Sequence, residues 1–125
     1  MKKLTYTLAA ATLALIAVVL VHAQDPVKVD SKHYKVVFEN DQVRVLHIQY
    51  APGEKSPMHH HPDSVAVFLG DQRAKFTYPD GKTEEVTAKA GEARWIPAGA
   101  HEPENISDKP LEVVLVEVKG KPEKK

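Results

Sequence analysis

The chain contains no cysteine, and its charges of opposite sign are equal in number. The lack of cysteine excludes disulfide bonds, thiolate catalysis and cysteine-based zinc sites, so any metal ion must be held by histidine, carboxylate or other oxygen ligands. With 17 basic and 17 acidic residues the formal net charge is zero. That balance argues against a nucleic-acid partner, since such proteins carry a clear basic excess. The length of 125 residues is enough for one domain.

The N-terminal segment has the three parts of a secretory signal peptide. A basic start at Lys2 and Lys3 is followed by an almost unbroken apolar run, residues 8–21, and then by small or apolar residues that fit cleavage after Ala23. The run has 14 residues, whereas a membrane-spanning helix needs about 20. We therefore expect residues 1–23 to be removed and the mature protein to be secreted or periplasmic. The alternative is an uncleaved membrane anchor.

The rest of the chain has a β pattern, with no window that shows the helical period of 3.6 residues. Residues 24–35 are polar and are expected to form a flexible N-terminal arm, residues 36–118 one β domain, and residues 119–125 a charged tail. Short segments rich in β-branched and aromatic residues recur at even intervals, which favours a sandwich or a barrel. The predicted strands are 34–38, 43–50, 65–69, 73–78, 83–87, 93–96 and 111–118.

The apolar positions of these strands predict the face that is buried. This face includes Val43, Val45, Val65, Val67, Val113 and Leu115. Four other side chains could line the interior or lie outside, and the pattern leaves both placements open. They are Arg44, Gln49, Tyr78 and Trp95.

Three consecutive histidines are the first candidate metal ligands. On an extended chain His59 and His61 point to one face and His60 to the other. Two imidazoles at this spacing can bind one ion, and His101, which follows the tight turn 97–100, is the candidate third ligand. Neutral imidazole suits zinc, iron, copper and nickel. The alternative is a polar surface loop that binds no metal.

Two further histidines are weaker candidates for a site. His33 lies in the polar arm and is expected to be solvated. His47 sits in a predicted strand, where it either lines a pocket or, as we favour, is partly buried and hydrogen-bonded.

Two patterns, taken together, resemble the motifs of the cupin superfamily. The first half of cupin motif 1 resembles the spacing of three residues here. Gly53 is followed, after five residues, by His59, and His61 comes one residue further on. Motif 2 is matched by Gly91, Pro97, Gly99, His101 and Asn105. The resemblance spans about residues 36–118 and implies an all-β fold, a double-sheet jelly-roll β-barrel with room for a ligand. It also implies that His59, His61 and His101 hold one divalent metal ion, drawn from Fe, Zn, Ni, Mn and Cu.

The sequence departs from motif 1 at its carboxylate. The motif places a Glu three or four residues after its second histidine, where this chain has Val65 and Ala66. Positions 59, 61 and 65 differ by even numbers, so strand parity predicts that Val65 faces the ion, with Ala66 as the alternative. The departure implies either a three-histidine site or a weakened or lost metal.

Two functions of different classes stay open, and a scaffold whose metal ion only adds stability is a third, less favoured one. One is a metal-dependent enzyme with dioxygenase-like or Lewis-acid chemistry on a small molecule, for which no catalytic residue beyond the histidines stands out. The other is a non-catalytic module that binds a small molecule such as a sugar or an acid. Both have a small-molecule ligand as partner, with no nucleic acid and no membrane in the mature form. The resemblance also allows a homodimer.

We expect intact-mass measurement of the exported protein to give a chain that starts at Gln24, because the cleavage signal ends at Ala23. A full-length species retained in the membrane would restore the anchor alternative.

Overall fold

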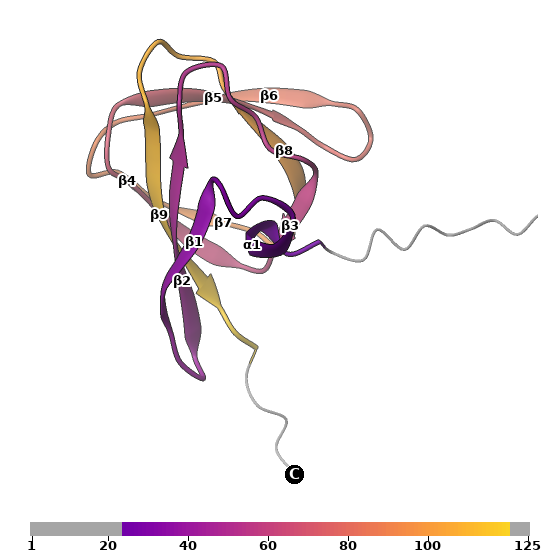
Figure 1. Cartoon of the computed structure of the whole chain (residues 1–125), viewed down its shortest axis with the longest axis vertical. Helices are drawn as coiled ribbons and strands as arrows, with labels where there is room; N and C mark the ends of the chain where they lie inside the picture. Colours follow the sequence, from indigo (N-terminus) through magenta and orange to yellow (C-terminus); the bar gives the residue numbers. More distant parts are fainter. Residues whose placement is uncertain (1–23, 121–125) are drawn as a thin grey trace, which may run out of the picture.

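Two antiparallel sheets make up the protein. The structure, a computed structural model, describes residues 24–120, so the predicted signal peptide 1–23 and residues 121–125 of the predicted tail lie outside the described residues. Residues 24–120 form nine strands and one helix of four residues, and the strands form one sheet of five and one of four (Figure 1). This is the predicted double-sheet jelly roll. No helix within this part of the chain is long and apolar enough to cross a membrane.

The larger sheet contains the first two strands and the last strand of the chain. Its spatial order is β1 Tyr34–Glu39, β2 Val43–Tyr50, β9 Leu111–Val118, β4 Ser64–Phe68 and β7 Ala93–Ile96. The central strands β2 and β9 pair along their whole length, from Val43 with Val118 to Tyr50 with Leu111. This long ladder fixes which alternate residues of the two strands point inward.

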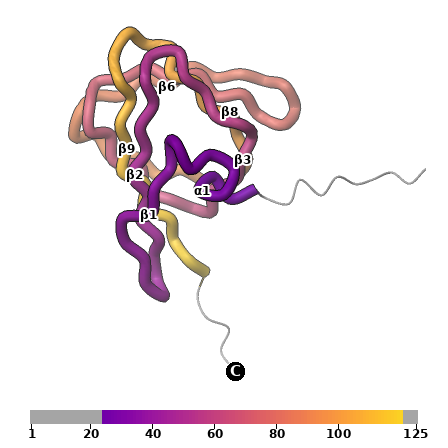
Figure 2. The backbone as a smooth tube through the Cα atoms, viewed as in Figure 1, coloured from indigo at the N-terminus to yellow at the C-terminus, as the bar shows by residue number. Residues whose placement is uncertain are grey.

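The smaller sheet carries the candidate metal ligands. Its spatial order is β3 His59–His61, β8 Gly99–Asn105, β5 Gln72–Thr77 and β6 Thr83–Ala88. The chain changes sheet repeatedly, as the trace in Figure 2 shows, and this winding makes β3 and β8 neighbours although they are far apart in the sequence. The two histidine-bearing segments therefore lie side by side.

The seven predicted strands are present, with bounds within one residue of those expected. Strands β3 and β8 were not in the predicted set: residues 59–61 were expected only to be extended, and residues 97–100 were expected to be a turn. β8 is the harder of the two to recognise. Gly99 and Pro103 lie within it, and both residue types are uncommon in strands. Most of its other positions are polar, so the apolar alternation that marks a half-buried strand is missing.

Residues 24–35 pack against the barrel and do not form the flexible arm that their composition suggests. They contain the helix α1 Pro26–Val29, which is capped by the side chain of Asp25 and contacts β1 and β3 (Figure 1). His33, expected to be solvated, is only 6% exposed, and its Nδ1 lies 2.7 Å from Oδ2 of Asp30. The polar groups of this segment bond to one another and to the barrel, which composition alone does not reveal.

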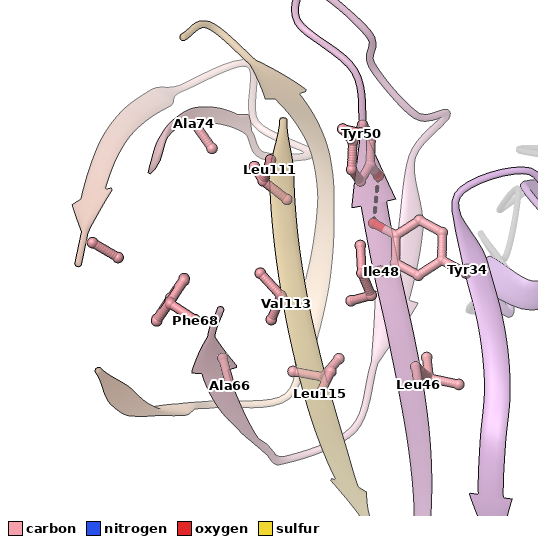
Figure 3. Packing of buried hydrophobic residues seen from close by; sticks show 11 residues of the cluster. Tyr34, Leu46, Ile48, Tyr50, Ala66, Phe68, Ala74, Leu111, Val113 and Leu115 are labelled. Carbon is pink, nitrogen blue, oxygen red and sulfur yellow. Dashed lines mark hydrogen bonds between the residues drawn. The ribbon is translucent and has the colours of Figure 1, made fainter. Parts of the chain in front are cut away.

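The core is built from alternate residues of the central strands (Figure 3). Its buried apolar members include Leu46, Ile48, Tyr50, Ala66, Phe68, Leu111, Val113 and Leu115. Val113 and Leu115 are therefore inside as predicted. The prediction was wrong for Val43, Val45, Val65 and Val67, which lie on the opposite face of the larger sheet and are half-buried. Both alternate sets of residues in these strands are apolar, so the period of two could not select the inner face.

We expect Leu46→Ala to lower the free energy of unfolding by about 2–5 kcal/mol, because Leu46 is 0% exposed and pairs with Leu115 at the centre of the core. Urea denaturation measures this change. Val37→Ala is the control, since Val37 is 58% exposed and its truncation should cost within about 0.5 kcal/mol. Equal losses in the two variants would contradict this description of the core.

Candidate metal centre

The structure brings the three predicted ligands together. His59 of β3 pairs directly with His101 of β8, and His61 lies two residues along β3 on the same face. One ring nitrogen from each of the three side chains lies within 4.8 Å of the other two. The ring centroids are 4.8–5.1 Å apart. His59 and His61 are buried and His101 is half-buried, so the cluster faces the interior of the barrel.

The middle histidine lies on the other face of β3. His59 and His61 are 1% and 3% exposed, whereas His60 between them is half-buried and outside the cluster. His60 pairs with Ala100, and its backbone N–H donates to the carbonyl oxygen of Gln24 in the N-terminal segment. The predicted alternation of the three histidines is therefore the one the strand adopts.

Hydrogen bonds determine which nitrogen two of the rings present to the cluster. His59 Nδ1 lies 2.9 Å from the carbonyl oxygen of Pro57, which can only accept. His61 Nδ1 lies 2.8 Å from Oε2 of Glu117. Each Nδ1 therefore carries the proton, and each Nε2 keeps a free lone pair. The Nε2 of His59 is buried without a hydrogen-bond partner.

The surroundings keep two of the imidazoles, those of His59 and His101, in their uncharged form. Burial, and then the charge of His61, lowers the pKa of His59 to about 4. Burial, and then His61 and His59, lowers the pKa of His101 to about 2. Because a metal ion binds the neutral ring, His59 and His101 need release no proton to bind one at neutral pH.

A chain of charged groups extends from His61 to the N-terminal segment. The Glu117 carboxylate is 2% exposed and also accepts from Nε of Arg44 at 2.6 Å. The other two guanidinium nitrogens of Arg44 donate to Asp25 at 2.7 and 3.0 Å. Burial alone would raise the pKa of Glu117, but the hydrogen bonds from His61 and Arg44 lower it below its usual value. Glu117 thus stays ionised and orients the His61 ring.

The parity argument for Val65 was wrong. Val65 pairs with Trp95 on the outer face of the larger sheet, whereas Ala66 is 4% exposed and lines the same cavity as His61. Parity is not preserved because residues 62–63 carry the chain from the smaller sheet to the larger one, and alternation holds only within one strand. Ala66 is thus the position from which a motif 1 carboxylate would enter the barrel.

His61 and His101 line a cavity of about 580 Å³, and His59 lies beside them in the cluster. Its walls are mainly apolar side chains from both sheets, among them Ile48, Phe68, Ala74, Phe76, Val113 and Leu115. Tyr34 and Tyr50 also line it, and their hydroxyl groups point toward each other at 2.5 Å (Figure 3). Burial is the largest cause that raises the pKa of both hydroxyl groups above the usual value, so both keep their protons at neutral pH.

The non-histidine motif residues shape the backbone around the site. Gly53 and Gly91 have φ of +79° and +84°, which residues with a Cβ rarely adopt. Asn105 is 0% exposed, and its Nδ2 donates to the carbonyl oxygens of Tyr50 and Lys109. These residues therefore fix the backbone of the turns, and the three histidines provide the ring nitrogens of the cluster.

A family model described as the cupin domain matches residues 46–117. The chain is a cupin. A cupin domain from Bordetella pertussis Tohama I is similar to it at 26% identity and a TM-score of 0.65, covering 70% of this chain and 92% of that one. A conserved protein with a double-stranded β-helix domain from Klebsiella pneumoniae is similar at 20% identity and a TM-score of 0.56, covering 80% of this chain and 86% of that one.

The polyketide cyclase RemF from Streptomyces resistomycificus is similar at 21% identity and a TM-score of 0.51, covering 71% of this cupin and 66% of that protein. At their identities, the Klebsiella and Streptomyces proteins show the fold alone. No curated protein matches the chain.

The structure places the four side chains that the sequence pattern left open between the interior and the outside. Tyr78 lines the cavity of the cupin, and Arg44 points toward the buried Glu117. Gln49 and Trp95 are exposed.

The sequence analysis missed Glu117, although it carries a signal. Leu111, Val113 and Leu115 form the buried face of β9, and Glu117 continues the same alternation. A carboxylate in register with a buried apolar face needs a partner, which here is His61 and Arg44.

We expect Glu117→Gln to weaken Zn²⁺ binding by about 10–100-fold, because the partner that orients the His61 ring loses its charge. Competition with a chromophoric chelator measures the affinity. Glu112→Gln is the matched control, since Glu112 lies on the outer face of the same strand and contacts His47, with 2.7 Å between Oε1 and Nε2. His47 is thus half-buried and hydrogen-bonded, as the sequence analysis favoured. A similar loss in both variants would contradict a specific role for Glu117.

Proposed function

We propose that this cupin binds one divalent metal ion through His59, His61 and His101 and acts as a metal-dependent enzyme on a small molecule held in the barrel. The observation that carries the proposal is the buried Nε2 of His59, which has no hydrogen-bond partner and belongs to a cluster of three ring nitrogens. A buried polar atom without a partner costs free energy, and a metal ion would satisfy it.

The residues around the cluster fit a divalent ion. Three imidazoles provide the ligands, and two of them are oriented through Nδ1 by the Pro57 carbonyl and by Glu117. An ion with three protein ligands keeps coordination positions for a substrate, where it would polarise a substrate oxygen as a Lewis acid or, if redox-active, support dioxygenase-like chemistry. The chain itself keeps the imidazoles of His59 and His101 neutral and would surround the substrate with apolar walls.

A non-catalytic binding module is the second candidate, and one observation favours it. The polar groups on the cavity wall are mostly bonded to other protein groups, so few are free to transfer protons. Asn105 bonds to backbone carbonyls, and Arg94 bonds to Glu92 and to the carbonyl of Thr87. Such a wall suits retention of a ligand as well as its conversion.

We further propose that the protein acts outside the cytoplasm, as a secreted or periplasmic protein. The signal-peptide pattern of residues 1–23 and the lack of a cysteine for lipid attachment support this location.

We expect wild-type protein to bind one Zn²⁺ per chain and His101→Ala to lose most of it, because two imidazoles from one strand leave the ion with too few fixed ligands. Elemental analysis after gel filtration measures the occupancy. His60→Ala is the control and should keep wild-type occupancy, since His60 lies outside the cluster. Full occupancy in His101→Ala, or an empty site in His60→Ala, would contradict the proposed ligand set.

The metal content of the native protein distinguishes the two candidate functions. Protein purified without a histidine tag from its native compartment would be analysed for metals. A redox-active metal or zinc at one per chain supports the enzyme, whereas metal-free protein that retains a small molecule supports the binding module.

A further inference from the structure

The inner face of β5 extends away from the histidine cluster. Phe76 lies near the cluster, with its ring centroid 5.0 Å from that of His101. Gln72 lies four residues earlier on the same strand, which is about 13 Å at the usual rise per residue. Because alternate residues of a strand share a face, Gln72, Ala74 and Phe76 all point inward, and all three line the cavity. The cavity therefore reaches from the histidines to Gln72.

The wall between these two ends has small apolar side chains. Ala74 lies between Phe76 and Gln72, and Ala66 of β4 lies on the wall formed by the other sheet (Figure 3). Ala88 pairs with Gln72 in the ladder of β5 and β6. The three alanines are 3–4% exposed, and their small side chains leave the middle of the cavity open. A ligand body in this space would contact mainly carbon atoms.

Most polar groups of the wall are already bonded within the protein. Asn105 donates to two backbone carbonyl oxygens, and Arg94 donates to a carboxylate and to a backbone carbonyl oxygen. The hydroxyl groups of Tyr34 and Tyr50 bond to each other. A sugar has a hydroxyl group on most of its carbon atoms, and many of these groups would have no partner on this wall, at a cost in free energy for each. The wall therefore favours a ligand with an apolar body.

Gln72 differs from these groups because half of its amide is free. Gln72 is 7% exposed, and its Oε1 accepts a hydrogen bond from the backbone N–H of Glu112 at 3.1 Å. A backbone N–H can only donate, so the amide oxygen must take this place and the amide nitrogen is left for another partner. Within residues 24–120, no hydrogen bond uses the N–H donors of Nε2. An acceptor on a ligand would remove the cost of leaving these donors unpaired beside an apolar wall.

We infer that the ligand of this site is an elongated molecule with an apolar body and an oxygen-containing group at each end. The inference rests on the proposed function for one end, where an oxygen atom binds the metal ion beside His61 and His101. At the other end a hydrogen-bond acceptor, such as a keto oxygen, meets Nε2 of Gln72. Gln72 is thus a specificity residue, because it selects ligands that carry the second oxygen at this distance from the first.

Calorimetry on the exported protein tests this inference with Zn²⁺ and three probes of one chain length. Zn²⁺ binding is measured first, and the loaded protein is then titrated with decanoate and two keto derivatives of it. In the end-keto chain the keto group is next to the last carbon, at the end that would meet Gln72. In the mid-keto chain it is at the middle of the chain, where the wall is apolar.

We expect the end-keto chain to bind about two- to tenfold more tightly than decanoate, which is the effect of one hydrogen bond, and the mid-keto chain to bind more weakly than decanoate. Moving a keto oxygen out of water costs free energy unless a donor meets it. Decanoate would therefore bind most tightly if Gln72 met no ligand oxygen, and that order would overturn the inference.

A matched pair of variants assigns the effect to the amide. Gln72→Met keeps the length of the side chain and removes the N–H donors, so decanoate should bind more tightly than the end-keto chain. Gln49→Met makes the same replacement at an exposed position of β2 and should keep the wild-type order. Gln72→Met also removes the acceptor of the Glu112 N–H, but a loss of stability weakens the binding of all three probes alike.

An unchanged order of the probes in Gln72→Met would contradict the role of Gln72. If this variant does not fold, the order of the three probes on wild-type protein still decides, because the two keto chains differ only in the position of one oxygen atom.

The order of the measurements separates the two proposals. Wild-type protein that binds no Zn²⁺ overturns the proposed function, and with it the metal-binding end of the ligand. Protein that binds Zn²⁺ but prefers decanoate to the end-keto chain overturns the inference alone.

Discussion

The pairing of β3 with β8 is the interaction on which the candidate metal centre depends. It sets His59 opposite His101 and leaves His61 on the same face. β3 has only three residues, so its position must be supported from outside the strand. Two backbone hydrogen bonds provide this support, from His60 to the carbonyl of Gln24 on one side and from Ser56 to the carbonyl of Pro103 on the other. The N-terminal segment therefore belongs to the architecture of the site.

The ion pairs around Arg44 connect the same segment to the site electrostatically. Arg44 holds Asp25 and Glu117 at once, and Glu117 orients His61. Moving a charged side chain from water into the protein interior costs several kcal/mol, and a well-placed ion pair only offsets that cost. The ion pairs of Arg44 with Asp25 and Glu117 are therefore better explained by the orientation of the His61 ring than by a gain in stability. The docked N-terminal segment and the orientation of the His61 ring are thus two aspects of one arrangement.

The residues of the cupin motifs fall into two groups with different structural roles. The histidines bring three ring nitrogens together, while Gly53, Gly91 and Asn105 hold the backbone turns around them. The carboxylate that is missing from motif 1 belongs to the first group, so its loss changes the charge of the site and leaves the turns intact. This separation explains how the chain keeps the cupin fold while its site differs from the usual pattern.

The sequence by itself determined seven of the nine strands, with β3 and β8 as the exceptions, and the alternation of His59 and His61 against His60. These features are local, because a period of two is set by the backbone of a single strand. Only the tertiary structure decided that Ala66 and not Val65 faces the cavity, and that Glu117 meets His61 across 56 positions of the chain. Parity ends where the chain changes sheet, and partners distant in sequence are chosen by how the sheets pack, which no local pattern encodes.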